Sequence, residues 1–406
     1  MNTTPRVLAI DEPRRYRALN RVLRHAHRHL PLYREAWSGI AAPGMQLPVV
    51  RQSEEMRQFP VVSREDLAVT PLAERLDARW PARLIGVERS GGSTGMPLEI
   101  PVDALSAWRR QWRFLRGLRE CGYRLGDRTL FLSTRATGPH PTVPGVFCVD
   151  LRAPSATVMR LYHQLRPRVV YGPLNSLMVL ADGLAAVPPH HLPEVVASTA
   201  EAMSAGQRAR LADVFGRDPA DFYGSSEAGL IAWRRPGQNT YRFPGRDFLV
   251  ELLPATAHTL YRLVITDLRS GGCSPLVRYD TGDVVETESA AGAVVRIHGR
   301  LVDCLMRRDG ALVSPYRVTL VLEGMPWIAR YQVVQRADLS VDLALVGQGV
   351  AEPERQARVL AALRTVVGAG VPIRVHPETG LFARDRRKFR PVRSEAVIHA
   401  HSDAVL

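Results

Sequence analysis

The sequence predicts an α/β fold, with a large N-terminal domain over residues 1–299 and a small α+β C-terminal domain over residues 300–406. Three observations predict it. Short apolar runs alternate with helical patterns over residues 127–223, as in mixed or parallel sheets that helices cover. Strands and turns follow this stretch and indicate an added β-rich subdomain. In the last segment, strand patterns flank one long helical pattern.

The N-terminal part of the chain reads as helical. Apolar residues recur three and four positions apart over Arg15–His29, which is the period of one helix face. Ser63 is expected to cap a helix that follows the extended stretch Pro60–Val62. A further helix is expected over Ala104–Cys121, before the alternating region begins.

The alternating region and the segments after it contain the other expected elements. Helices are expected at Ala156–Leu165, Leu174–Ala186, Ser204–Phe215 and Glu352–Val367. Strands are expected at Thr129–Ser133, Arg168–Tyr171, Val195–Ser198, Asp221–Tyr223, Phe248–Leu253, Leu260–Thr266, Val294–Ile297, Tyr331–Gln335, Val341–Val346 and Ile373–His376. The first four of these strands would form the parallel sheet.

The composition is that of a globular protein. Of the 406 residues, 46% are hydrophobic and 23% are charged, which argues against disorder and fibrous repeats. The 4 cysteines form no Cys-x-x-Cys pair, so neither a zinc ribbon nor a redox dithiol is indicated, and their sparseness fits a reducing cytoplasm. We find no signal-peptide pattern at the start and no run of about 18 apolar residues, and therefore expect no membrane association.

The basic charge is spread along the chain. Lysine and arginine number 54 against 40 acidic residues, a formal charge of +14 that could attract nucleotides, nucleic acid or an acidic partner protein. No basic stripe is interleaved with aromatics, so we expect a solvated surface and no nucleic-acid partner. The only lysine is Lys388. Either one lysine survived by chance, or this position needs a compact charge on a flexible stem.

A stretch of small residues at Ser90–Pro97 is the strongest local signal. Backbone N–H groups of such a loop can converge on an anion, and glycine permits the close approach that this requires. The stretch lacks the spacing of a Walker P-loop. Most loops of this kind are plain turns, so by itself it indicates phosphate binding only weakly.

Further motifs follow this loop in a fixed order. They are Tyr223-Gly224-Ser225-Ser226-Glu227, Arg278-Tyr279-Asp280-Thr281-Gly282-Asp283, Gly299-Arg300-Leu301-Val302-Asp303 and Lys388. Together they resemble the adenylate-forming superfamily of acyl-CoA synthetases and adenylation domains. The stretches Pro60–Leu67, Arg166–Gly172 and Ala200-Glu201 are typical of its phenylacetate–CoA ligase branch. The resemblance spans roughly residues 30 to 395.

The resemblance implies an enzyme that activates a carboxylic acid, aromatic or similarly compact, with ATP and Mg²⁺. The carboxylate would attack the α-phosphorus of ATP, pyrophosphate would leave, and an acyl-adenylate would form. A thiol, most often that of coenzyme A, would then take the acyl group. In this family the small, mobile C-terminal domain rotates between the two steps.

The resemblance also implies roles for particular residues. Catalysis would use Lys388, Ser226 and Glu227, with Glu227 also binding Mg²⁺. Binding of ATP or AMP is expected at Ser90, Gly91, Gly92, Ser93, Thr94, Gly95, Glu201, Tyr223, Gly224, Ser225, Asp283 and Arg300. Contacts to the acid are expected at Tyr171, Ser198 and His140. Each of these residue types also occurs in ordinary turns and exposed loops.

Some positions depart from the family pattern. Met96 stands where many relatives have lysine, and Val302 stands at the usual hinge position. Valine is stiff at this point, which calls the rotation into question. The segment 134–149 lacks the glycine-rich run expected near the acyl pocket, which indicates an unusual substrate.

Two alternatives stay open on the sequence. The adenylate could pass to an acidic carrier protein or to an amine, as in specialised metabolism. The chain could instead be a nucleotide-binding or nucleic-acid-binding scaffold without activity, although Lys388, Glu227 and Asp283 argue against this. The sequence does not distinguish a monomer from a dimer.

Overall fold

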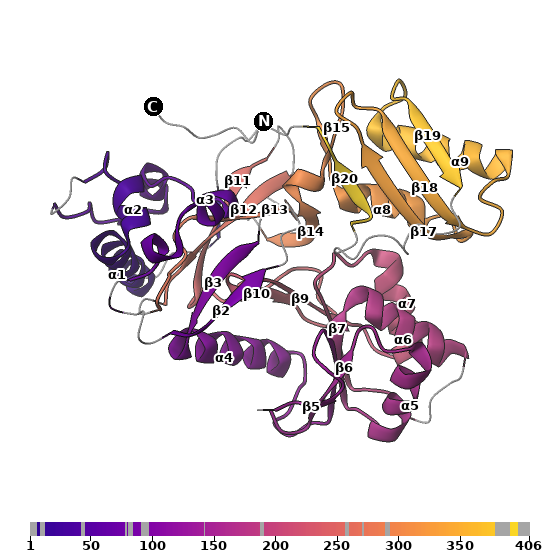
Figure 1. Ribbon diagram of the computed structural model, residues 1–406, viewed down its shortest axis with the longest axis horizontal. Helices are drawn as coiled ribbons and strands as arrows, with labels where there is room; N and C mark the ends of the chain where they lie inside the picture. Colours follow the sequence, from indigo (N-terminus) through magenta and orange to yellow (C-terminus); the bar gives the residue numbers. More distant parts are fainter. Residues whose placement is uncertain are drawn as a thin grey trace. The chain divides into compact units, whose positions relative to one another are not determined.

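The computed structural model describes residues 6–8, 13–41, 45–77, 79, 84–90, 97–141, 143–186, 191–255, 260–269, 272–288, 293–377 and 390–396 (Figure 1). The chain divides into two units. Unit 1 comprises Met1–Ser106 and Gly245–Leu406, and unit 2 comprises Ala107–Pro244. The predicted α/β class is confirmed, since both units combine sheets with helices.

Unit 2 is built on a seven-stranded sheet. Its strands, in spatial order, are β10 (Gly229–Arg234), β9 (Ala220–Ser225), β8 (Val195–Thr199), β7 (Val169–Pro173), β4 (Thr129–Ser133), β6 (Val146–Asp150) and β5 (Gly138–Pro139). The five strands from β9 to β6 are parallel, and the two edge strands are antiparallel. The chain runs from β4 outward to β6 and then returns to β7 on the other side. This reversal makes the sheet doubly wound, with its switch point beside β4.

Helices cover both faces of this sheet. They are α4 (Ala104–Glu120), α5 (Ser155–Leu165), α6 (Leu174–Ala186) and α7 (Ala205–Phe215). Figure 1 shows α5 to α7 on one side and α4 on the other. Because strand side chains alternate, Val170 and Val196 pack with α5 to α7, whereas Val169 and Val195 join the cluster that contains Leu118 of α4. The strands are buried on both faces, which is why the sequence predicted them as short continuous apolar runs.

Unit 1 contains a five-stranded antiparallel sheet. Its order is β1 (Arg6–Leu8), β11 (Phe248–Pro254), β12 (Leu260–Asp267), β13 (Tyr279–Thr287) and β14 (Val294–Arg300). A separate hairpin is formed by β2 (Leu84–Ser90) and β3 (Leu98–Asp103). The helical elements before β3 are α1 (Pro13–His29), α2 (Pro31–Ala36), η1 (Ser53–Gln58), α3 (Arg64–Val69) and η2 (Leu72–Arg75). Neither β1 nor the β2–β3 hairpin was predicted from the sequence.

The predicted cap of α3 is confirmed. The Ser63 hydroxyl accepts a hydrogen bond from the Asp66 N–H at 3.0 Å, and the Asp66 carboxylate accepts one from the Ser63 N–H at 2.7 Å. This reciprocal capping box satisfies two backbone donors at the start of the helix.

The C-terminal part of unit 1 has its own sheet and core. The elements after β14 are η4 (Leu301–Asp303), β15 (Leu305–Met306), β16 (Leu312–Val313), α8 (Pro315–Glu323), β17 (Ile328–Gln335), β18 (Val341–Gly347), α9 (Pro353–Val367), β19 (Ile373–Pro377) and β20 (Val392–Ser394). The sheet order is β19-β18-β17-β20. Its apolar cluster contains only residues between Leu305 and Val392. The boundary predicted between residues 299 and 300 falls inside unit 1 and stays a prediction.

A buried ion pair anchors the five-stranded sheet. Arg278 donates to the Glu251 carboxylate, with 2.9 Å between Nη2 and Oε1, and the two side chains are 5% and 3% exposed. Arg278 also donates to the Phe59 carbonyl. Next to it, Val62 forms a bridge with Tyr279, so the predicted extended stretch at residues 60–62 lies against β13.

We expect Glu251→Gln to lower the free energy of unfolding by about 3–5 kcal/mol, because the Arg278 cation would stay buried without its counter-charge. Urea denaturation measures this. The matched control is Glu99→Gln, which breaks the exposed Arg89–Glu99 pair and should cost less than about 1 kcal/mol. Equal losses in the two variants would contradict the structural role of the buried pair.

Candidate active site

The predicted Tyr223–Glu227 motif lies at the end of β9 and in the turn that follows. The last β8 residue to pair with β9 is Thr199, opposite Phe222, so Tyr223 and the residues after it extend past the neighbouring parallel strand. Ligands of open α/β sheets bind at this carboxyl edge of the strands. The sequence motif therefore stands where a nucleotide site is expected.

The turn itself is tight. Ser225 of β9 faces Gly229 of β10, and the Ser225 hydroxyl accepts a hydrogen bond from the Ala228 N–H at 3.1 Å. Ser226 and Glu227 lie in this turn. Glu227 as a whole residue is only 9% exposed. The turn at this edge of the sheet thus contains one largely buried acidic residue.

Glu201 lies on the same edge, whereas Tyr171 is the middle residue of β7. Glu201 follows β8, and its carboxylate accepts a hydrogen bond from the Asn175 N–H at 3.0 Å. The Tyr171 ring, on β7, contacts the rings of Phe114 and Phe131 at centroid distances of 5.0 and 5.1 Å. Burial raises the pKa of Tyr171 to about 12, so the phenol stays protonated at neutral pH.

Ser198 is fully buried. Its hydroxyl donates to Oδ1 of Asp221 at 2.8 Å, and the Tyr241 hydroxyl donates to the other oxygen. Burial raises the pKa of Asp221, and the two hydroxyl donors oppose this shift. The Ser198 hydroxyl is therefore engaged inside the sheet, and its predicted contact with the substrate stays a prediction.

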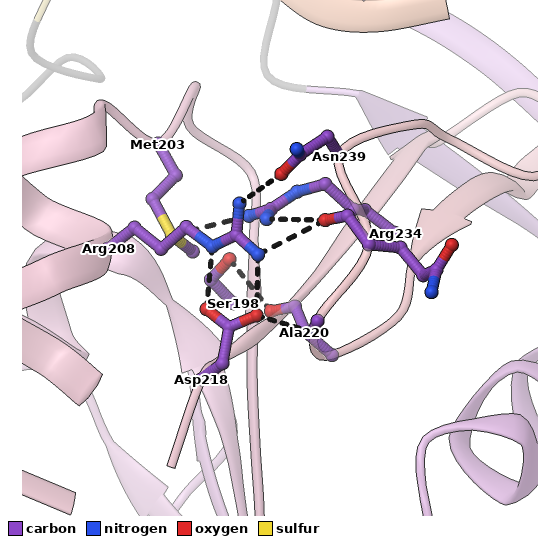
Figure 2. A network of polar contacts seen from close by, with 9 residues as sticks. Ser198, Met203, Arg208, Asp218, Ala220, Arg234 and Asn239 are labelled. Atoms are coloured by element: carbon purple, nitrogen blue, oxygen red, sulfur yellow. Dashed lines mark hydrogen bonds and ion pairs between the residues drawn. The ribbon is translucent and has the colours of Figure 1, made fainter.

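A polar network beside Ser198 joins α7 to the β9–β10 side of the sheet. Figure 2 shows Arg208 between Asp218, Arg234 and Asn239. Arg208 donates from two nitrogens to the Asp218 carboxylate at 2.6 and 2.5 Å and from a third to Asn239 Oδ1 at 3.1 Å. These charge-assisted bonds hold the strand that leads into the Tyr223–Glu227 motif.

His140 lies just after the edge strand β5. Its Nδ1 accepts a hydrogen bond from the Val143 N–H at 3.2 Å. Partial burial lowers the pKa of His140, and the nearby charge of Arg135 adds to the effect, so the ring is neutral at pH 7. The predicted contact of His140 with the acid stays a prediction.

Unit 1 brings Asp283 and Arg300 together. They face each other across β13 and β14, and Arg300 Nε lies 3.1 Å from Asp283 Oδ1. The resemblance implies that both residues bind ATP or AMP, which stays a prediction. A carboxylate and a guanidinium side by side can accept from and donate to adjacent hydroxyls.

Ser90 lies at the end of β2, opposite Leu98 in the hairpin. Its hydroxyl accepts a hydrogen bond from Arg64 Nη2 at 2.6 Å. Arg64 is buried and was not predicted to have a role, because an arginine in the first turn of a helix is usually exposed and carries no local signal. The predicted phosphate-binding residues Gly91, Gly92, Ser93, Thr94 and Gly95 lie outside the described residues.

Lys388 also lies outside the described residues. Arg390, two positions later, forms an ion pair with Asp303 of η4. Asp303 follows Arg300 by three positions and the predicted hinge residue Val302 by one. Arg390, the first described residue after the lysine, is therefore paired with a residue only three positions from Arg300.

No group of three or more His, Cys, Asp or Glu side chains could hold a metal ion within the described ranges. A Mg²⁺ ion bound to nucleotide phosphates needs only one or two protein carboxylates, which a single residue such as Glu227 would provide, and the predicted Mg²⁺ role of Glu227 stays a prediction. In the part of the chain that the structure describes, no helix is both long and apolar enough to span a membrane.

Neither a scan of protein-family models nor a search of curated proteins found a match for this chain. Solved structures do match. A 2-hydroxyisobutyryl-CoA ligase in the postadenylation state has 17% sequence identity and a TM-score of 0.72, covering 94% of this chain and 89% of that chain. The anthranilate CoA ligase AuaEII has 18% identity and a TM-score of 0.58, covering 77% of this chain and 66% of that chain.

The amide bond synthetase McbA from Marinactinospora thermotolerans has 19% identity and a TM-score of 0.54, covering 73% of this chain and 65% of that chain. Identities this low establish the fold alone. The chain has the fold of the adenylate-forming ligases, which confirms the predicted resemblance at that level. The phenylacetate–CoA ligase branch stays a prediction.

Gly224 gives a test of the hairpin geometry. A Cβ at this position would lie 2.5 Å from the Gly229 carbonyl oxygen, so we expect Gly224→Ala to cost about 1–3 kcal/mol through backbone displacement. Gly206→Ala in α7 is the control, because its Cβ meets nothing closer than 3.8 Å and alanine favours helix. Thermal unfolding should show a lower melting temperature for Gly224→Ala and a higher one for Gly206→Ala. An unchanged melting temperature in Gly224→Ala would contradict the close approach.

Proposed function

We propose that this protein activates a carboxylic acid with ATP to form an acyl-adenylate and then transfers the acyl group to a thiol or an amine. The observation that carries the proposal is the placement of the Tyr223–Glu227 motif at the carboxyl edge of a doubly wound sheet, in a chain with the fold of adenylate-forming ligases. The proposal needs both parts, because a fold alone does not determine a reaction.

The candidate nucleotide-binding residues occur in each of the two units. Tyr223 offers a flat face for adenine, and Asp283 with Arg300 offers hydrogen bonds to the ribose hydroxyls. The stretch Ser90–Gly95 would bind the phosphates through backbone N–H groups. The bond from Arg64 to Ser90 supports this, because it places a buried cation at the first residue of that stretch.

Glu227 would hold Mg²⁺ together with the phosphate oxygens, and Ser226 would form a hydrogen bond with a phosphate. When bound, the ion neutralises charge on the phosphates. The carboxylate of the acid attacks the α-phosphorus, the bond to pyrophosphate breaks, and Lys388 stabilises the negative charge that gathers there. Positioning and fixed charge would provide most of the rate enhancement.

We propose an aromatic or similarly compact acid as the substrate and coenzyme A as the preferred acceptor. The partly buried rings of Phe114, Phe131 and Tyr171, which contact one another between α4, β4 and β7, support a flat apolar acid. Two of the similar structures are CoA ligases, which supports a thiol acceptor. The amide bond synthetase supports transfer to an amine as the second candidate, with a carrier-protein thiol as a further variant.

The direct test is ATP–pyrophosphate exchange across a panel of aromatic and aliphatic acids. We expect exchange with at least one compact acid, and a loss of several orders of magnitude in Lys388→Ala, because that variant lacks the charge that stabilises the transition state. Arg387→Ala removes the neighbouring charge and serves as the control. Adding coenzyme A or amines to the active mixture then identifies the acceptor.

Wild-type exchange in Lys388→Ala would exclude the role of the lysine. No exchange by the wild-type protein with any acid would exclude the proposed function.

Recognition of the ribose can be tested separately. We expect the wild-type protein to prefer ATP over 2′-deoxy-ATP, and Asp283→Ala to lose most of this preference, because a hydrogen bond to a charged group contributes about 1.5–3 kcal/mol. The measurement is kcat/KM for both nucleotides in the exchange assay. Equal discrimination by both proteins would show that Asp283 does not contact the 2′-hydroxyl.

A further inference from the structure

Arg110 of α4 binds the turn that carries Glu227. Its Nη1 donates to the Ser226 carbonyl at 3.1 Å, and its Nη2 donates to the Glu227 carbonyl at 2.7 Å. These two carbonyls belong to the peptide groups on either side of the Glu227 Cα. One guanidinium therefore restrains the backbone on both sides of the carboxylate-bearing residue.

Arg113, three positions later, extends this contact. Its Nη1 donates to the Ala228 and Leu230 carbonyls at 2.9 and 3.2 Å, and the residue is 5% exposed. Positions three apart lie on the same face of a helix. Four carbonyls of residues 226–230 thus accept hydrogen bonds from two arginines on one face of α4.

The packing between α4 and the turn is close. A Cβ at Gly229 would lie 3.1 Å from Cγ of Arg110, and the positive φ of 71° already disfavours other residues there. A Cβ at Gly117 would lie 2.9 Å from a methyl carbon of Leu230. The two glycines let the helix approach the hairpin, so Arg110 meets the turn at a fixed distance.

The chemistry of arginine suits this task. Its planar fork presents several N–H donors in a fixed arrangement and keeps its charge at all physiological pH values. Lysine is a point charge on a flexible stem and cannot hold two carbonyls in one plane. A residue that must fix two successive peptide groups is therefore expected to be arginine.

We propose that Arg110 is a positioning residue of the active site, which holds the peptide groups around Glu227 so that the carboxylate keeps its direction toward Mg²⁺ and the nucleotide phosphates. This inference rests on the proposed function. Arg110 contacts the turn and not the reacting atoms, so it acts through Glu227. A displacement of the carboxylate by about 1 Å would lower the rate by up to about a hundredfold.

The test compares Arg110→Gln, Arg110→Lys and the control Arg119→Gln, which removes the same charge from an exposed position of α4. In ATP–pyrophosphate exchange, we expect Arg110→Gln to lower kcat at least tenfold with a smaller change in the KM for ATP. The Mg²⁺ concentration for half-maximal exchange should rise several-fold. Arg110→Lys should have a kcat and a Mg²⁺ requirement between those of Arg110→Gln and the wild-type protein, and Arg119→Gln should match the wild-type protein.

A second readout does not depend on activity. Amide hydrogen exchange of residues 226–230 should be faster in Arg110→Gln than in Arg119→Gln. Without the hydrogen bonds from Arg110, the backbone of the turn is less restrained and its N–H groups open to solvent more often. If the wild-type protein exchanges no pyrophosphate, the proposed function fails, while amide exchange still tests the contact. The inference is overturned if Arg110→Gln matches Arg119→Gln in kcat and Mg²⁺ dependence, or if the amides exchange equally fast.

Discussion

The buried pair of Arg278 and Glu251 is the constraint on which the candidate nucleotide site of unit 1 depends. Two charges buried this deeply are tolerated only when each satisfies the other. The pair joins β11 to the residue before β13, and β13 carries Asp283. Its register with β14 then places Arg300 opposite that carboxylate. The ion pair and the backbone ladder of the sheet together support the side-by-side placement of Asp283 and Arg300.

In unit 2, the ends of the parallel strands and supporting hydrogen bonds position the Tyr223–Glu227 motif. The parallel strands stop at Thr199 on β8, and β9 continues past that point into its hairpin with β10. Hydrogen bonds to the buried Asp221 support β9, and Arg110 of α4 donates hydrogen bonds to the turn. Residues buried in the sheet and in α4 therefore support the short turn that carries the predicted site residues.

The structure changes the physical reading of several predicted residues. Gly224 was predicted to bind ATP or AMP, and the structure adds that the hairpin itself requires a glycine there, because the Gly229 carbonyl occupies the space of a side chain. Ser198 was predicted to contact the acid, which stays a prediction, and its hydroxyl donates to Asp221 inside the sheet. At both positions the motif indicated that the residue type matters, but the local pattern could not show that the neighbours are Gly229 and Asp221.

The sequence by itself determined the alternation of strands and helices, the cap at Ser63 and the order of the motifs from Tyr223 to Lys388, because periodicity, capping and turn chemistry are local properties of the chain. Only the tertiary structure decided which of the many arginines hold the fold and the site. Arg110 and Arg119 lie on one helix and are alike in sequence terms. The first binds a carbonyl 116 positions away and the second faces solvent, since burial arises from contacts that no local pattern records.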